Sequence, residues 1–235
     1  MLRQLWEERN KDGRGTYTPP RIHKFPLAPA MHNSALQSII DSLPSDLYSP
    51  NQHGKPIHDL EDSKTLTLVP ESNTASFLQI LHTPGHTTDS IAIYLPFDHA
   101  LYTADTVLGQ GTAVFEDLAS LITSLGKMRD FGGYTKLYPG HGPVVDDGPK
   151  WINTYIEHRM KREEEIVQIL GSDEDGCDGT RTTWTIVSKI YATYPQNLWL
   201  PAAHSVDLHL KKLEKDGRVK HIGGEGKDGQ WALVK

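Results

Sequence analysis

The sequence has a single cysteine and lacks any long apolar run, and both scarcities exclude classes of protein. One cysteine, Cys177, cannot form a disulfide within the chain and fits a reducing compartment. No apolar run is long enough to span a bilayer, and residues 1–8 are too acidic and too poor in apolar side chains for a signal peptide. We therefore expect an intracellular protein without a membrane partner. The cytoplasm is the default location, and a mitochondrial one is left open.

A surplus of positive charge is also missing. The 235 residues include 24 Lys and Arg against 30 Asp and Glu, which gives a formal net charge of −6. Global charge therefore does not favour nucleic-acid binding, although a local basic cluster near the C-terminus could contact phosphates. A solvated helix face is the simpler interpretation of this cluster. Its members are Lys211, Lys212, Lys215, Arg218 and Lys220.

Hydrophobic periodicity is present, and it predicts an α+β chain. Apolar stripes at helical spacing predict helices over residues 1–10, 33–43, 115–131 and 149–170. Alternating or short apolar runs predict strands over residues 65–69, 76–82, 90–95, 99–104 and 136–138. Strands separated by turns and followed by long helices indicate one sizeable domain.

A Gly- and Asp-rich stretch at residues 171–180 is the clearest linker in the chain. It separates a domain over residues 1–170 from a smaller one over residues 181–235. In the smaller domain we expect two helices followed by a β-hairpin, the order of a winged-helix module. The helices are expected over 183–194 and about 202–215, and the strands over 218–222 and 230–234.

Three strand ends carry the side chains best suited to chemistry. Pro-Gly-His turns stand at residues 84–86 and 139–141, and an aspartate ends the strand between them. Imidazole and carboxylate are the usual zinc ligands of hydrolases, and glycine lets the backbone turn tightly beside each histidine. A single loop histidine is more often a surface residue, but the repeated turn favours a metal site assembled by tertiary structure. The candidate ligands are His86, Asp105 and His141.

These motifs resemble the later metal-binding motifs of the metallo-β-lactamase superfamily. The matching stretches are Thr-Pro-Gly-His-Thr at 83–87, Tyr-Thr-Ala-Asp at 102–105 and Tyr-Pro-Gly-His-Gly at 138–142. The long helix around residues 155–159 and the C-terminal tail resemble a lactamase-β-like branch with a C-terminal winged helix. That branch includes an animal mitochondrial endoribonuclease and fungal thioesterases that release polyketides from acyl carrier proteins.

The resemblance implies a fold, a site and a reaction. His86 would complete a first zinc site, Asp105 would bridge two zinc ions and carry the catalytic role, and His141 would belong to the second. Ala104 stands where the family usually has glycine, which we interpret as a mild change. The implied activity is hydrolysis of a thioester or related acyl bond in a small-molecule or acyl-carrier-bound substrate. Phosphodiester cleavage in single-stranded RNA is the alternative chemistry.

One expected part is absent. The family signature His-x-His-x-Asp-His does not occur, and the strands that would precede it are missing too. We therefore expect an αββα sandwich without its first strands and, at most, weak or partial zinc binding, since a catalytic zinc normally has three protein ligands. A catalytically inactive binding protein or relic, or an incomplete gene product, is the competing hypothesis. The histidines that lack the signature spacing are His23, His32, His53 and His58.

The other histidines have simpler interpretations. His82 is expected to face outward or to support the site without binding metal. The pair His158-Arg159 resembles a family pair and could supply a structural hydrogen bond near the site. His99, His204 and His209 are expected to be solvated or packing residues.

Overall fold

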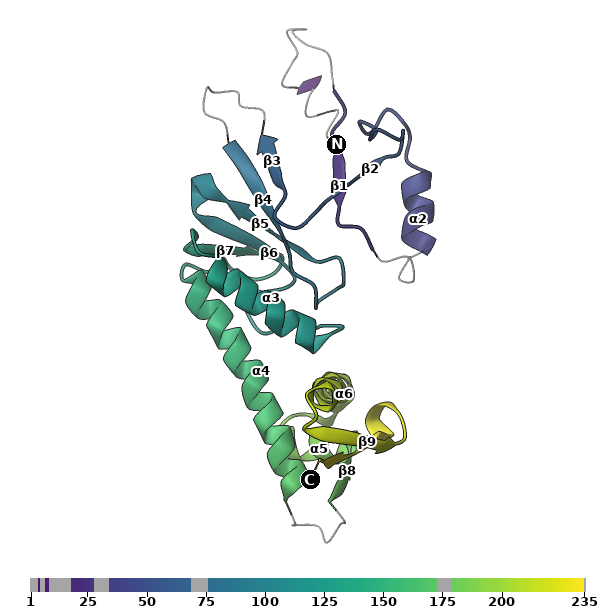
Figure 1. Cartoon of the computed structure of the whole chain (residues 1–235), viewed down its shortest axis with the longest axis vertical. Coiled ribbons are helices and arrows are strands. Elements are labelled where there is room, and N and C mark those ends of the chain that lie inside the picture. Colours follow the sequence, from purple (N-terminus) through teal and green to yellow (C-terminus); the bar gives the residue numbers. More distant parts are fainter. Residues whose placement is uncertain are drawn as a thin grey trace. The chain divides into compact units, whose positions relative to one another are not determined.

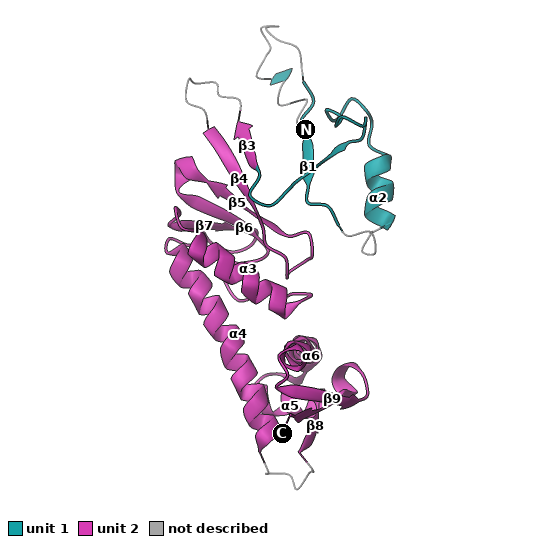
Figure 2. Ribbon diagram, viewed as in Figure 1, with its two compact units in different colours: residues 1–64 teal, residues 65–235 magenta. Residues whose placement is uncertain are grey.

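The computed structural model describes residues 18–27, 34–68, 76–172 and 179–234, together with residues 4, 7 and 8. Two compact units divide the chain, one over residues 1–64 and one over residues 65–235 (Figure 2). Among the described helices, none has the length and apolar character needed to cross a bilayer.

Some predictions fall outside the described residues. They include Cys177, His32, the centre of the predicted linker 171–180, and all but three positions of the predicted helix 1–10. The division into domains 1–170 and 181–235 stays a prediction.

Over residues 18–27 and 34–64, the first unit contains two short strands and one helix. β1 (Ile22–Lys24) and β2 (Ile57–Asp59) pair in parallel, and α2 (Ser34–Asp41) lies between them in the chain. The helix confirms its prediction, but both strands were missed because three residues are too few to show a periodic pattern. His23 and His58 are register partners, and their ring centroids lie 5.2 Å apart.

A five-stranded sheet forms the centre of the second unit (Figure 1). Its first four strands are antiparallel neighbours, and the last runs parallel to the fourth. Each of the predicted strands is confirmed to within one residue at its ends. In spatial order the strands are β3 (Thr65–Leu68), β4 (Ser76–His82), β5 (Ile91–Leu95), β6 (Ala100–Ala104) and β7 (Lys136–Pro139).

Two helices cover one face of this sheet. α3 (Leu118–Phe131) forms the crossover that a parallel β6–β7 pair requires, and α4 (Gly148–Gly171) follows β7. α3 begins later than the predicted 115–131 because the Asp117 side chain caps it, accepting a hydrogen bond from the Ser120 N–H at 2.7 Å. The shared core includes Leu81, Ala92, Leu101, Leu121, Leu125, Leu137 and Ile152.

The opposite face of the sheet is less covered. Tyr102 is 42% exposed, whereas its chain neighbour Leu101, which points to the helices, is fully buried. Ile93 and Tyr138, the register partners of Tyr102, are only partly buried. One sheet with helices on a single face is half of an αββα sandwich, in agreement with the predicted fold without its first strands.

The C-terminal segment has the predicted helix, helix and hairpin. α5 (Thr183–Ile190) is shorter than predicted, and α6 (Trp199–Lys215) begins about three residues earlier than predicted, with a proline in its first turn. A three-stranded sheet in the order β8-β10-β9 packs with them. Its strands are β8 (Thr180–Thr182), which the sequence did not predict, β10 (Gln230–Leu233) and β9 (Val219–Gly223).

The long helix α4 connects the two cores of the second unit (Figure 1). Its first half contributes Ile152 to the core under the sheet. Its second half contributes Ile166 and Leu170 to a core shared with α5, α6 and the small sheet. The helix therefore fixes the C-terminal segment beside the loops that leave the large sheet.

Candidate functional site

The first Pro-Gly-His turn is anchored to the start of α3. Gly85 has a φ of +137°, and a Cβ at this position would lie 2.4 Å from the Leu121 Cα. The Gly85 carbonyl accepts hydrogen bonds from the backbone N–H groups of Glu116 at 2.7 Å and Asp117 at 3.2 Å. Only glycine fits both the φ angle and the close approach, so this residue sets where the next histidine stands.

His86 leaves this turn with its ring orientation fixed. Its Nδ1 lies 2.9 Å from the Val114 carbonyl oxygen, and that oxygen can only accept. The proton is therefore on Nδ1, which leaves the Nε2 lone pair free. A histidine held through Nδ1 in this way is oriented to bind a metal through Nε2. His86 Nε2 faces Asp105 Oδ2 at 3.9 Å.

Asp105 stands between the two predicted histidine ligands. Its Oδ2 faces His86, and its Oδ1 lies 3.5 Å from Nε2 of His141. The side chains of Asp105 and His141 are 40% and 76% exposed. The carboxylate therefore turns one oxygen toward each imidazole. We call His86, Asp105 and His141 the candidate metal edge.

The backbone around Asp105 is compact. The Gly140 N–H donates to the Ala104 carbonyl at 2.7 Å, and a Cβ on Gly140 would lie 2.4 Å from Asp105 Oδ1. Glycine is therefore required in the second Pro-Gly-His turn. Ala104 itself has a φ of +46°, a left-handed conformation that costs a side-chain-bearing residue about 1 kcal/mol. The alanine that we interpreted as a mild change strains the backbone next to Asp105.

A row of side chains on α4 holds the loop behind the edge. Trp151 Nε1 donates to the Leu108 carbonyl at 2.8 Å, and the Leu108 N–H donates to the Tyr155 hydroxyl at 2.9 Å. Arg159 Nη2 donates to the Ala113 carbonyl at 2.6 Å, which is the structural hydrogen bond expected from the His158-Arg159 pair. The sequence assigned no role to Trp151. Trp151, Tyr155 and Arg159 follow one another at intervals of four residues, and this helical spacing was the available signal.

The donor set fits zinc in chemistry but does not complete a site. Two imidazoles and a carboxylate are suitable ligands, and they converge from three separate strand ends. Among the residues that the structure describes, however, no group of three or more His, Cys, Asp or Glu side chains is placed to hold a metal ion. The three donors lie as two pairs that share Asp105, so further donors are needed for a closed coordination shell.

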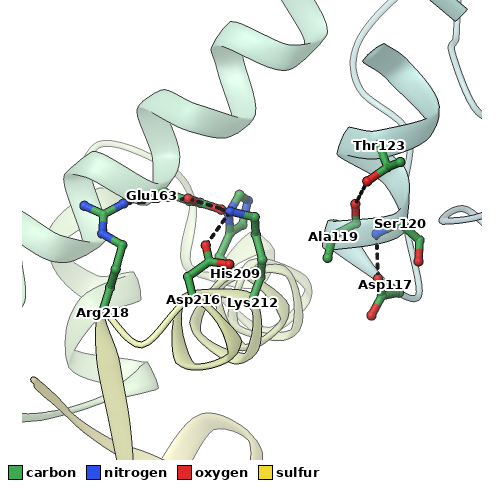
Figure 3. Close-up of polar contacts among 9 residues, drawn as sticks. All are labelled: Asp117, Ala119, Ser120, Thr123, Glu163, His209, Lys212, Asp216 and Arg218. Atoms are coloured by element: carbon green, nitrogen blue, oxygen red, sulfur yellow. Dashed lines mark hydrogen bonds and ion pairs between the residues drawn. The ribbon is translucent and has the colours of Figure 1, made fainter. Parts of the chain in front are cut away.

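Most of the basic cluster near the C-terminus is paired with carboxylates, and Figure 3 shows these pairs for Lys212 and Arg218. Lys212 Nζ lies 2.9 Å from Glu163 Oε1 and 2.8 Å from Asp216 Oδ2, and Lys215 Nζ lies 3.0 Å from Asp117 Oδ2. Burial alone would lower the pKa of Lys212, but hydrogen bonds to Asp216 and Glu163 outweigh burial and raise it. With its side chain only 13% exposed, Lys212 is not the solvated residue that we expected.

His82 and His209 both make contacts with other residues of the protein. His82 Nε2 lies 2.9 Å from the Thr88 carbonyl oxygen, which agrees with a supporting residue in the turn before His86. His209 is 1% exposed and packs edge-on against the Phe115 ring, with centroids 5.9 Å apart. Neither histidine belongs to the candidate metal edge.

Two family models match the sequence. One, described as the metallo-beta-lactamase superfamily, matches residues 23–167 and so includes all three candidate ligands. The other, described as the beta-lactamase associated winged helix domain, matches residues 182–231. Together they cover the buried residues of both cores of the second unit except Leu170.

Two curated relatives illustrate the range of similarity. The beta-lactamase-like protein 2 homolog of Caenorhabditis elegans is 44% identical over 144 residues, which are 61% of this chain and 47% of that protein. The atrochrysone carboxyl ACP thioesterase of Aspergillus chevalieri is 34% identical over 123 residues, 52% of this chain and 40% of that protein. The chain thus spans about half the length of the curated relatives it matches.

A solved structure supports the fold. The chain is similar to a beta-lactamase domain protein from Burkholderia ambifaria, with a TM-score of 0.62 and 18% sequence identity. The likeness covers 86% of this chain and 59% of that one. At this identity it shows the fold alone.

Proposed function

Because this chain belongs to the metallo-β-lactamase superfamily, we propose that it acts in a zinc-dependent hydrolase that cleaves a thioester or a related acyl bond. The observation that carries the proposal is Asp105, which turns one oxygen toward His86 and the other toward His141. The acyl substrate is supported by a fungal relative whose name describes a thioesterase acting on an acyl carrier protein.

His86, Asp105 and His141 would hold the metal together with further donors. Bound zinc supplies an activated hydroxide and stabilises negative charge that develops on the attacked group. The residues of this chain set the geometry. Val114 fixes the tautomer and direction of the His86 ring. Gly140 lets the second turn lie against the Asp105 carboxylate, whose exposure leaves the edge open to a substrate.

Cleavage of single-stranded RNA has less support. Phosphate contacts would need free cations, but Lys212 and Lys215 are already paired with carboxylates of the same chain. A hydrolase for small or carrier-bound acyl substrates therefore agrees better with the charges near the edge.

Metal binding is the first test. The purified chain is stripped with a chelator, equilibrated with zinc and dialysed, and bound zinc is measured by elemental analysis. We expect Asp105→Asn to lower zinc affinity by about tenfold or more, because the shared carboxylate is lost. Asp130→Asn is the matched control, since Asp130 is an exposed carboxylate at the end of α3. Equal zinc binding by the two variants, or none by the parent chain, would refute the metal assignment.

Activity is measured separately on two substrates. One assay follows release of free thiol from an acyl thioester of N-acetylcysteamine, and the other follows cleavage of a single-stranded RNA. We expect zinc-dependent thiol release that Asp105→Asn abolishes. Zinc binding without either reaction would favour the non-catalytic binding protein, and cleavage of RNA alone would favour the endoribonuclease-like alternative.

A further inference from the structure

A cavity of about 270 Å³ lies between α4, α6 and residues 112–115. We call it the α4–α6 cavity. The loop that lines it includes Val114, whose carbonyl oxygen holds the His86 ring. The cavity is therefore a neighbour of the candidate metal edge, although none of the three candidate ligands lines it.

Two residues of the cavity wall are buried and have polar atoms without hydrogen-bond partners. Arg159 is 5% exposed, and its Nε has no hydrogen-bond partner among the described residues. His209 is 1% exposed, and neither of its ring nitrogens has one. Within the described part of the chain, Arg159 donates to the Ala113 carbonyl through Nη2, so its guanidinium keeps donors for a ligand that accepts hydrogen bonds.

The charge of the cavity wall is positive. Arg159 pairs with no carboxylate in the described part of the chain, and burial lowers its pKa to about 10, so it is still charged at neutral pH. Arg162 lines the same cavity, with Glu165 3.2 Å from its Nη1 as an ion-pair partner. Of these two guanidinium groups, Arg162 has a carboxylate partner and Arg159 has none, which leaves one positive charge to be matched.

The rest of the wall suits a flat apolar molecule. The Phe115 ring lies under the Arg159 guanidinium with 4.6 Å from Cζ to the centroid, and the Tyr191 ring lies 4.7 Å from Cζ of Arg162. Guanidinium groups stacked on aromatic rings keep their edges available for a planar, bidentate acceptor. Leu208 adds a further apolar wall.

We propose that the α4–α6 cavity binds a small aromatic carboxylate, with Arg159 and Arg162 facing the carboxylate and the apolar wall holding the ring. The volume fits a molecule of one or two rings, somewhat below the range of drug-sized sites. Binding in this cavity does not depend on whether the neighbouring candidate metal edge is catalytic.

The test is calorimetric titration of the purified chain, in chelator, with 2-naphthoate and with its neutral analogue 2-naphthamide. We expect the carboxylate to bind about tenfold more tightly than the amide, because only the carboxylate pairs with the guanidinium groups. Chelator separates this result from the zinc experiment, so either proposal can fail without the other.

Arg162→Gln removes one cation from the cavity without breaking the contact between Arg159 and Ala113 that holds the loop. We expect it to weaken naphthoate binding by about tenfold and to leave naphthamide binding unchanged. Lys161→Gln makes the same change in net charge at the exposed neighbouring residue, which does not line the cavity, and it should bind as the parent chain does. Ser205→Phe, from α6, should fill the cavity and remove binding of both compounds.

Several results would overturn the proposal. They are naphthamide binding as tightly as naphthoate, equal effects of Arg162→Gln and Lys161→Gln, and undisturbed binding to Ser205→Phe. Inorganic phosphate that binds as tightly as naphthoate would also refute the aromatic acid, because the ring would then contribute nothing. Circular dichroism of each variant shows that it is folded, so a loss of binding cannot be assigned to unfolding.

Discussion

At the candidate metal edge, Asp105 has histidine nitrogens at 3.5 and 3.9 Å, while between α4 and α6 the Glu163 carboxylate lies 4.0 Å from Nδ1 of His209. A carboxylate thus faces a histidine ring at two places in this molecule. Their exposures differ widely, since the His141 side chain is 76% exposed and that of His209 is 1% exposed. Exposure decides whether such a pair is available to an external ligand.

The group around Glu163 is buried, so its polar side chains pair with other residues of the protein. Glu163, His209 and Lys212 form what we call the buried polar cluster (Figure 3), in which the Lys212 ammonium contacts the Glu163 carboxylate at 2.9 Å. Burial, followed by the positive charges of Arg159 and Arg162, lowers the pKa of His209 to about 3. In the part of the chain that the structure describes, no lysine or arginine pairs with Asp105, so this carboxylate stays available. Changes to the buried cluster should therefore affect stability, and changes to the edge should affect metal binding.

The largest expected effect comes from Lys212→Met. This change leaves the buried Glu163 carboxylate with Arg218, at 3.9 Å, as its remaining cation. Losing one partner of a buried ion pair costs about 3–5 kcal/mol, measured as the free energy of unfolding in urea. The double variant Glu163→Met/Lys212→Met should recover most of that loss, because the charges that lose a partner, Asp216 and Arg218, are both accessible to solvent.

Lys227→Met is the matched control for this pair. Lys227 lies 2.8 Å from Asp228, and both side chains are exposed, at 50% and 70%, so the pair should contribute less than about 1 kcal/mol. If the variants of Lys227 and Lys212 lost the same stability, burial would not be the feature that distinguishes the cluster from the edge.

A change in the turn that carries His86 should have the next largest effect. In Gly85→Ala the new methyl group would meet the Leu121 backbone, which cannot move without shifting α3. We expect a loss of about 2–3 kcal/mol in the free energy of unfolding, from overpacking and an unfavourable φ together. Gly126→Ala, inside α3 with open space around it, should instead stabilise the protein by about 1 kcal/mol. A mild effect of Gly85→Ala would show that the edge is not rigidly supported.

The sequence was most informative where residues act through local patterns. The strands of the large sheet follow from alternation, and the two Pro-Gly-His turns identify both histidines because proline and glycine stop a strand in a recognisable way. β1, β2 and β8 were missed because strands of three residues carry no period, and their pairing depends on distant partners.

Tertiary contacts account for what the sequence could not predict at the site. Ala104 looked acceptable in place of glycine, because only the folded chain shows its φ of +46°. Lys212 looked like a solvated side chain, because its partner Glu163 lies 49 residues earlier, on another helix. Arg159 was noticed only as part of a motif, and its contact with Ala113 needed the fold to bring α4 beside the loop.

Acid should destabilise the protein through His209. An ordinary histidine in the unfolded chain has a pKa near 6.5, well above the value of about 3 in the fold. Between these values the unfolded state binds a proton that the folded state does not, so stability falls as the pH falls. From pH 7 to pH 5 we expect His209 to account for a loss of roughly 2 kcal/mol in urea unfolding. His209→Leu should flatten this dependence, whereas His204→Leu, at an exposed position of the same helix, should not.

Ala104→Gly should remove the backbone strain beside Asp105. Glycine adopts a φ of +46° without steric cost, although it also gives the unfolded chain more freedom. The balance favours the variant by about 1 kcal/mol, measurable as a raised unfolding midpoint in urea. An unchanged or lower midpoint would mean that contacts of the Ala104 methyl group offset the strain, and the edge would then be more firmly packed than its exposure indicates.

The smallest effect on stability should come from the candidate metal edge itself. His141 is mostly exposed, and its nearest charged partner is the half-exposed Asp105, so His141→Ala should change the free energy of unfolding by less than about 0.5 kcal/mol. The same variant should lose about tenfold in zinc affinity, because one of three converging donors is gone. The two measurements on one variant separate a residue kept for an external ligand from one kept for the fold. A loss of stability comparable to that of Lys212→Met, without a change in zinc affinity, would place His141 with the buried polar cluster as a structural residue.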